Sequence, residues 1–162
     1  MKAVIGIGTN VGDRTESIRK AVEALDLLPD VKVLRCASIY ETDPWGYTEQ
    51  QSFYNTVAEV ETTKSPEMLL GACLGIEAGM GRIREFKNGP RVIDLDLLVY
   101  EDYQNDSHDI TIPHPLIGER DFVLVPLKEL YVDMDVLGFL YRNQYENIVK
   151  KSSAKKVEKN LK

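Results

Sequence analysis

Hydrophobic and polar positions change their period several times along the first third of the chain. Residues 4–7 form a short apolar run, and apolar side chains then recur at helical spacing between positions 18 and 28. Asp13 and Glu16 form a capping box, and Pro29 follows the last helical position. This pattern predicts a strand and then a helix that begins after Asp13 and ends before Pro29.

The middle of the chain predicts two strands, the loop between them and a second helix. Residues 31–40 have a strand-like pattern, residues 42–46 are rich in turn formers, and residues 53–62 alternate in polarity. Ser65 followed by Pro66 is a helix start, and apolar residues follow at helical spacing. The expected buried stripe of this helix is Met68, Leu69, Ala72, Cys73, Ile76 and Met80.

The segment from Val92 to Tyr100 is the clearest strand, because it is long and rich in branched residues. The order of elements to this point is β-α-β-β-α-β. That order is typical of the ferredoxin-like fold, in which an antiparallel four-stranded sheet carries both helices on one face. We therefore expect an α+β protein with an additional C-terminal strand near 110–112, helical turns at 116–119 and 124–130, and a last helix near 139–149.

Composition and charge narrow the class of protein. The 162 residues, 43% hydrophobic and 28% charged, suit one folded domain, and no apolar run is long enough to cross a bilayer. The net charge of −6 disfavours a nucleic-acid binder with a broad basic surface. Residues 150–162 carry six lysines and one acid. We expect a single domain over 1–149 and a lysine-rich, disordered tail over 150–162.

The two cysteines and the first residues of the chain indicate in which cellular compartment the protein is expected. Cys36 and Cys73 are isolated within apolar patterns, so buried free thiols are expected rather than a disulfide or a metal pair. The chain starts without the apolar pattern of a secretory leader, and a cytoplasmic location is therefore expected.

Asp94 and Asp96 are the sharpest local signal. Side chains alternate along a strand, so the two carboxylates share one face at a spacing of roughly 6–7 Å. The other face receives the apolar residues Ile93, Leu95, Leu97 and Val99. Two carboxylates on a partly buried sheet require cations to offset their repulsion and lost hydration. Mg²⁺ shared with substrate phosphates suits this spacing, and a solvated pair without a ligand is the alternative.

A basic cluster precedes this strand. Arg82, Arg84, Lys87 and Arg91 lie in a glycine-containing segment, and guanidinium groups bind phosphate oxygens in bidentate fashion. Cations beside an Asp pair indicate a polyphosphate together with a metal, whereas an ordinary solvated loop is the alternative. His114, flanked by prolines, and Arg120 add further polar groups downstream.

Other features of the sequence concern ligand groups besides phosphate. Phe53 and Asn55 share one strand face, so an aromatic plate lies beside an amide that could bind the edge of a flat heterocycle. A core phenylalanine beside a turn-capping asparagine is the alternative. The glycines from Gly6 to Gly12 lack the dinucleotide-binding spacing and indicate a tight turn with close backbone approach. P-loop and protein-kinase motifs are also missing from the sequence.

Several motifs occur together in one order between positions 7 and 126. They are Ile7-Gly8-Thr9-Asn10-Val11-Gly12-Asp13, Ser38-Ile-Tyr-Glu-Thr42-Asp-Pro-Trp-Gly46, Phe53-Tyr-Asn55, Glu77 with Gly81-Arg82-Ile-Arg84, Gly89-Pro-Arg91-Val-Ile-Asp94-Leu-Asp96, and Ile112-Pro-His114-Pro with Arg120-Asp-Phe122-Val-Leu-Val-Pro126. With these motifs the chain resembles the 6-hydroxymethyl-7,8-dihydropterin pyrophosphokinase family. The resemblance implies transfer of pyrophosphate from ATP to the pterin hydroxymethyl group in folate biosynthesis, with release of AMP.

The resemblance also implies roles for individual residues. Asp94 and Asp96 would hold two Mg²⁺ ions, Asp96 would lie near the attacking oxygen, and Arg82 and Arg91 would clamp the β- and γ-phosphates. The ATP side would be lined by Glu77, Arg84, Leu97, Thr111, His114 and Arg120. The pterin side would be lined by Thr42, Pro44, Trp45, Phe53, Asn55 and Phe122. The expected partners are these two small-molecule substrates, with no nucleic acid and no membrane, and the expected state is a monomer.

Two positions depart from the family pattern, and two other classes of protein remain as alternatives. Phe86-Lys87-Asn88 stands where many members have a tryptophan before Gly-Pro-Arg, in a loop one residue shorter, and Trp45 replaces a smaller apolar residue. A palm-type nucleotidyltransferase would need a basic template groove. A ferredoxin-like sensor module without catalysis would not need the basic cluster beside two aspartates.

Overall fold

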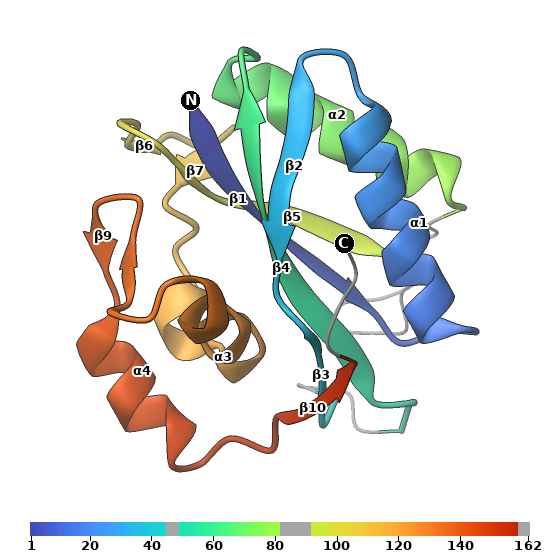
Figure 1. Cartoon of the computed structure of the whole chain (residues 1–162), viewed down its shortest axis with the longest axis vertical. Coiled ribbons are helices and arrows are strands. Elements are labelled where there is room, and N and C mark those ends of the chain that lie inside the picture. Colours follow the sequence, from blue (N-terminus) through green and yellow to red (C-terminus); the bar gives the residue numbers. More distant parts are fainter. Residues whose placement is uncertain (45–48, 82–91, 159–162) are drawn as a thin grey trace.

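The computed structural model describes residues 1–44, 49–81 and 92–158 and shows an antiparallel sheet with helices on both faces (Figure 1). The predicted site residues Trp45, Arg82, Arg84 and Arg91 lie outside the described residues. Among the described residues, no helix has the length and apolar character needed to cross a membrane.

The main sheet has strands in the order β10-β3-β4-β1-β5, and each pair is antiparallel. Its members are β1 (Lys2–Thr9), β3 (Ile39–Thr42), β4 (Phe53–Thr62), β5 (Asp94–Tyr100) and β10 (Lys155–Glu158). Strand β2 (Val31–Cys36) also pairs with β4, farther along it than β3. The long β4 therefore organises the sheet, with β1 on one side and β2 and β3 on the other.

The strand predicted over residues 31–40 is two strands in the structure. It is interrupted at Ala37 and Ser38, where the Ala37 N–H donates to the Val57 carbonyl at 2.9 Å and the Ser38 N–H donates to the Glu129 carboxylate at 2.9 Å. The second of these bonds draws the backbone away from the regular ladder toward a helix distant in sequence. The periodicity of residues 31–40 therefore could not show the interruption.

Helices α1 (Arg14–Leu27) and α2 (Pro66–Gly79) confirm the predicted helix starts. The Asp13 carboxylate accepts from the Glu16 N–H at 3.1 Å, and the Ser65 hydroxyl accepts from the Met68 N–H at 3.2 Å. Both helices pack on one face of the sheet around a core of Ile5, Ile7, Ile18, Ala21, Leu25, Leu69 and Cys73. The inclusion of Met68 in the buried stripe is wrong, because its position on α2 faces solvent and leaves the side chain exposed.

The second face of the sheet is covered by C-terminal elements. Helix α3 (Asp121–Leu130) packs over Val4, Val57 and Leu98, and α4 (Arg142–Val149) packs beside it. The predicted helical turns are found as a short 3₁₀ turn (Ile117–Glu119) and as α3, which begins earlier than predicted. The predicted last helix begins at Arg142 instead of Phe139, because Phe139–Leu140 forms β9, which pairs with β8 (Asp135–Val136).

Strand β5 departs from the simple alternation expected of it. Val4 pairs with Val99 and Ile5 with Leu97, so Leu98 is an extra residue in the ladder. Leu95 and Leu97 lie in the core below α1 and α2, as predicted, but Leu98 and Val99 pack toward α3. The placement of Val99 with Leu97 is therefore wrong, because a bulge shifts the faces of all later residues.

The prediction of a disordered tail is wrong for residues 155–158. Lys155–Glu158 form β10 and pair with β3, with Lys155 opposite Glu41 and Lys156 opposite Tyr40. Backbone hydrogen bonds build such a ladder whatever the side chains, and the lysines here face acidic neighbours. A lysine-rich composition therefore did not prevent this segment from adding a strand to the sheet.

Both cysteines are free thiols, as expected. Cys73 is buried, and burial with the nearby charges of Glu77 and Asp96 raises the pKa of its thiol to about 12. Cys36 is only half-buried.

Strands β6 (Asn105–Asp106) and β7 (Thr111–Ile112) form a small hairpin beside β5. Strand β7 is the additional strand predicted near residues 110–112.

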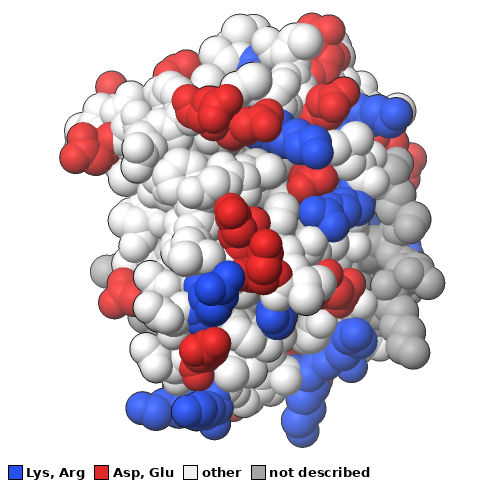
Figure 2. Space-filling model, turned by 60° about the vertical axis from the view of Figure 1, so that its left-hand side comes forward, with Lys and Arg blue, Asp and Glu red and all other residues white. Residues whose placement is uncertain are grey.

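Charged side chains are interspersed on the face of the molecule shown in Figure 2. Acidic side chains predominate in the upper and central part of that face, and several of the described lysines and arginines gather along its lower part.

Candidate active site

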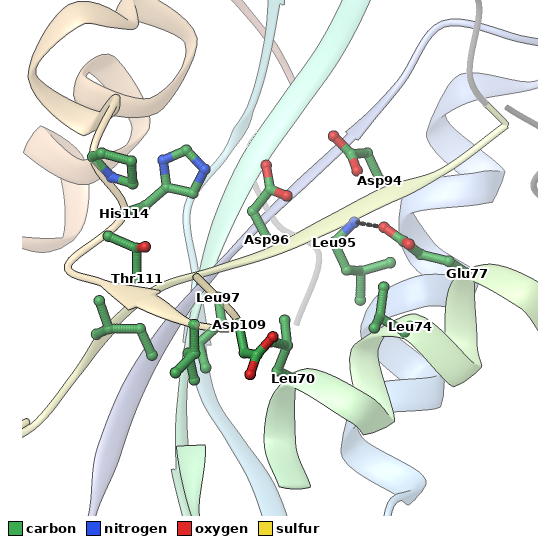
Figure 3. Close-up of a pocket in the computed structure, with 13 residues that line it drawn as sticks. Leu70, Leu74, Glu77, Asp94, Leu95, Asp96, Leu97, Asp109, Thr111 and His114 are labelled. Atoms are coloured by element: carbon green, nitrogen blue, oxygen red, sulfur yellow. Dashed lines mark hydrogen bonds between the residues drawn. The ribbon is translucent and has the colours of Figure 1, made fainter. Parts of the chain in front are cut away.

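Asp94 and Asp96 lie at the start of β5 and point to the same side of the strand, as predicted (Figure 3). Both are half-buried, and both line a cavity of about 340 Å³. The cavity lies between α2, β5 and the segment that follows β6. Its other polar side chains are Glu77, Asp109, Thr111 and His114.

Two glycines on β1 lie beside this pair in the sheet. Gly8 pairs with Asp94 on one side and Asn55 on the other, and Gly6 pairs with Asp96 and Val57. Directly opposed residues in a sheet project from the same face. Asn55 and the two aspartates therefore share one face, and Gly8 separates them without a side chain of its own.

The Asn55 side chain lies directly above Gly8. A Cβ atom built on Gly8 would overlap the Asn55 Oδ1 atom, so the amide occupies the space that any other residue at position 8 would take. Asn55 is only 8% exposed, and its Nδ2 group has no hydrogen-bond partner among the described residues. A buried donor without a partner costs about 1–3 kcal/mol, and it is therefore a site where a ligand acceptor is expected.

His114 is held by two hydrogen bonds of the backbone. Its own N–H donates to the Leu98 carbonyl at 2.8 Å, and the Leu116 N–H donates to its Nδ1 atom at 3.2 Å. Burial lowers the pKa of His114, the Arg120 charge lowers it further, and the Asp94 charge opposes them. The ring is therefore neutral at pH 7, and because Nδ1 accepts, Nε2 carries the proton as the remaining donor.

Arg120 connects the aspartate pair with an aromatic ring. Its guanidinium lies 4.0 Å from the Asp96 carboxylate and 5.4 Å from the centre of the Phe122 ring. Arg120 directly precedes α3, and Phe122 lies in the first turn of that helix. The start of α3 therefore supplies a cation and an aromatic ring next to the carboxylates.

Glu77 extends from α2 to β5. It is 4% exposed, and its carboxylate accepts a hydrogen bond from the Leu95 N–H at 2.7 Å (Figure 3). Leu95 stands between the two aspartates. Glu77 therefore fixes the backbone from which both carboxylates project.

Replacing Glu77 with alanine should lower the free energy of unfolding by about 1–3 kcal/mol, because the buried Leu95 N–H loses its acceptor. Glu77→Gln retains an acceptor oxygen and should cost less. Urea unfolding of the two variants measures the difference. Equal stabilities of wild type and Glu77→Ala would show that this bond does not hold β5 in place.

One wall of the cavity is apolar, and Leu97 is its one member that the family resemblance placed on the ATP side. Leu70 and Leu74 on α2 line it, and β5 and the β6–β7 hairpin contribute Leu97, Ile110 and Ile112. Leu74 is 55% exposed, so part of this wall is open to solvent. Positions 70, 74 and 77 follow helical spacing on a second face of α2, and this pattern was the available signal. Asp109, which also lines the cavity, carried no such signal.

The structure brings together most of the described residues that the sequence singled out. Asp94, Asp96, Glu77, Leu97, Thr111 and His114 line the cavity. On the same face of the sheet, Thr42 pairs with Phe53 at the end of β3, and Pro44 follows two residues later. Arg120 and Phe122 stand opposite, at the start of α3. Two adjoining regions result, one around the aspartates and one around Asn55.

The chemistry of these regions defines a class of protein. A carboxylate pair with an arginine and a neutral histidine suits a phosphate-bearing ligand, an apolar wall suits a planar base, and an unpartnered amide suits a polar heterocycle. Together these features suit a site that takes a phosphate-bearing ligand with a planar base beside a polar heterocycle.

The particular family follows from comparison with known proteins. Residues 4–132 match the model of the 7,8-dihydro-6-hydroxymethylpterin-pyrophosphokinase (HPPK) family. The chain belongs to this family, which confirms the resemblance seen in the sequence.

Relatives from several organisms agree with this assignment. The chain is 42% identical over 137 residues to a 2-amino-4-hydroxy-6-hydroxymethyldihydropteridine pyrophosphokinase of Methylorubrum extorquens, covering 85% of this chain and 87% of that protein. A Bacillus subtilis protein of the same name is 42% identical, with coverages of 79% and 77%. The folic acid synthesis protein fol1 of Schizosaccharomyces pombe is 45% identical over 132 residues, covering 82% of this chain but only 18% of that protein.

Solved structures show the same fold. An HPPK-DHPS crystal structure in complex with substrates matches with a TM-score of 0.70 and 16% identity, over 92% of this chain and 43% of that one. A Plasmodium falciparum HPPK-DHPS triple mutant has the same TM-score and identity, with 93% and 42% covered. The chain spans less than half of these larger proteins.

As a member of this family, the chain is a pterin pyrophosphokinase. It transfers pyrophosphate from ATP to the hydroxymethyl group of 6-hydroxymethyl-7,8-dihydropterin in folate synthesis. The alternatives of a palm-type nucleotidyltransferase and a sensor module are set aside by this result.

Proposed function

We propose that Asp94 and Asp96 hold Mg²⁺ for this reaction, and the observation that carries the proposal is their shared, half-buried face beside the cavity. Carboxylate oxygens are the ligands that Mg²⁺ prefers, and it is commonly bound by one or two carboxylates plus substrate phosphates. Among the described residues, no group of three or more His, Cys, Asp or Glu could hold a metal without such help. The donor set therefore fits ions that arrive with a polyphosphate, and we propose two of them.

The cavity is the proposed ATP side. Glu77, Leu97, Thr111 and His114 line it, and the wall around Leu70 and Leu74 suits an apolar base. The neutral His114 can donate a hydrogen bond without repelling the Arg120 charge. Arg84 is proposed to join this side, and Arg82 and Arg91 to clamp the β- and γ-phosphates, all three outside the described residues.

The region around Asn55 is the proposed pterin side. The Asn55 amide offers a donor and an acceptor to the edge of the heterocycle, and Phe53 and Phe122 would flank its ring. Thr42 and Pro44 would line the same region, and Trp45 is proposed to join them from outside the described residues. Substrate discrimination would follow from Asn55, because a ligand without matching edge groups leaves its amide unpartnered.

The reaction is an in-line attack of the pterin hydroxymethyl oxygen on the β-phosphorus, and AMP is the leaving group. Such a transfer requires positioning and charge neutralisation more than covalent chemistry. Mg²⁺, when bound, would neutralise charge on the phosphates. Arg120 orients the Asp96 carboxylate, Glu77 fixes the strand beneath it, and Asp96 is proposed to lie beside the attacking oxygen.

The fold family, the domain bounds, the oligomeric state and the cellular location stay predictions. The antiparallel strand order with two helices on one face supports assignment to the ferredoxin-like fold. A single domain, the monomeric state and the cytoplasmic location are proposed from the sequence alone. The end of that domain at residue 149 does not fit the structure, because β10 joins the main sheet.

Removal of the metal tests the proposal directly. With purified chain, ATP and 6-hydroxymethyl-7,8-dihydropterin, chelation of Mg²⁺ by EDTA should slow AMP release by about 10²-fold or more, because metal stabilisation of phosphoryl transfer is worth several kcal/mol. Excess Mg²⁺ should restore the rate. Ca²⁺ should restore it poorly, since it prefers more ligands at longer distances. AMP release that persists at full rate in EDTA would refute the metal role.

A further inference from the structure

The C-terminal segment 152–158, here named the C-terminal strap, lies outside the family match, which ends at residue 132. In Figure 1 it returns from α4 to the sheet and ends as β10 beside β3. Three of its side chains contact elements that belong to the pterin side of the site. These contacts connect the strap to the pterin side, although the strap lies outside the part of the chain that matches the family.

Two serines of the strap join opposite walls of the pterin region. The Ser152 hydroxyl donates to the Asp121 carboxylate at 2.7 Å, and Asp121 lies between Arg120 and Phe122. The Ser153 hydroxyl accepts from the Asp43 N–H at 3.2 Å, directly after Thr42. Adjacent residues of the strap therefore tie the start of α3 to the end of β3.

Lys156 reaches the same region through a polar network. Its Nζ atom lies 3.8 Å from the Glu129 carboxylate and 6.0 Å from the centre of the Tyr40 ring. The Tyr40 hydroxyl donates to Glu129 at 2.8 Å, and Tyr40 pairs with Asn55 across the sheet. The network therefore ends beside the amide proposed to bind the pterin.

The strap also covers the outer edge of β3, because β10 pairs with that strand. Strand β3 has four residues, and three of them pair with β4. Without β10 it would be an edge strand with one unpaired side, and short edge elements open at little free-energy cost. Thr42 lies at the end of this strand, so any fraying of β3 would displace it.

We propose that the C-terminal strap is a positioning element for the pterin substrate. It sets the distance between the wall at the end of β3 and the wall at the start of α3, and thereby the affinity for pterin. The strap does not line the ATP cavity, so ATP affinity does not depend on it. The proposal rests on the proposed placement of the pterin between Thr42, Phe53, Asn55 and Phe122.

Point variants of the full chain test this role. Ser153→Ala and Lys156→Glu should each raise the KM for pterin about fivefold, the loss expected of one net hydrogen bond or ion pair, and leave the KM for ATP within about twofold. Lys151→Glu is the matched control, because it makes the same charge change at a side chain without a hydrogen bond or ion pair among the described residues. Ser153→Thr retains the hydroxyl and should restore the wild-type KM.

The outcomes separate the two proposals. Asn55→Ala is measured in parallel. It should raise the KM for pterin whether or not Ser153→Ala and Lys156→Glu do. If it does and both strap variants keep the wild-type KM, the strap has no positioning role. If Asn55→Ala also leaves the KM unchanged, the placement of the pterin itself is wrong. Equal increases in the KM for ATP and for pterin would indicate general loosening and would also overturn the proposal.

Discussion

Asp96→Ala should slow AMP release by about 10³-fold or more, because it removes a proposed Mg²⁺ ligand and the carboxylate beside Arg120 together. The fold should remain cooperative, since Asp96 is half-buried and its removal relieves repulsion from Asp94. Single-turnover measurement of AMP with saturating substrates separates the chemical step from binding. Thermal unfolding of the same preparation checks that the variant is folded.

Asp109→Asn provides the matched control for Asp96→Ala. Asp109 is an aspartate that lines the same cavity, but it projects from the segment between β6 and β7 and is not one of the β5 pair. Its substitution should leave the chemical step nearly unchanged. Retention of most of the activity in Asp96→Ala, or equal losses in the two variants, would show that the β5 pair has no special role.

Gly8→Ala is expected to have the second largest effect, because the added Cβ overlaps Oδ1 of Asn55. Overpacking of this kind costs about 1–3 kcal/mol of stability. The displaced amide can no longer meet the edge of the pterin, so kcat/KM for pterin should fall by about 10²-fold. Kinetics with each substrate varied in turn should show that the loss is confined to the pterin.

A second substitution separates the two effects of Gly8→Ala, which are the loss of stability from overlap with Asn55 and the loss of pterin binding by the Asn55 amide. Asn55→Ala in the Gly8→Ala background removes the overlap, so stability should recover while kcat/KM for pterin stays low. Gly71→Ala is the control for the change of residue type, because its added Cβ would meet no atom within 4 Å apart from its chain neighbours and the backbone of its own helix. As a glycine within α2, it should gain about 0.5–1 kcal/mol. Normal pterin kinetics in Gly8→Ala would mean that Asn55 does not bind this substrate.

The helix starts and the aspartate pair could be predicted from the sequence because their causes are local. Asp13 and Ser65 cap residues three positions later, within one helical turn. Asp94 and Asp96 share a face because any strand alternates, whatever it pairs with. The motifs shared with the family then extended these local signals to the activity, which the comparisons confirm.

Other parts of the site depend on partners that are distant in sequence. Leu70 and Leu74 became a cavity wall only when α2 packed beside β5 and the β6–β7 hairpin. The Glu77 carboxylate meets a backbone N–H eighteen positions away, and the sequence does not show that bond. The break between β2 and β3 similarly depends on Glu129, ninety-one residues beyond Ser38.

The sequence by itself determined which residues could carry the chemistry and how each short segment would fold. Only the tertiary structure decided the bulge at Leu98, the placement of the Asn55 amide over Gly8 and the return of the lysine-rich C-terminus to β3. The physical reason is that capping and alternation act over a few residues. Strand pairing, bulges and close packing are determined by whichever backbone and side chains arrive from elsewhere in the chain.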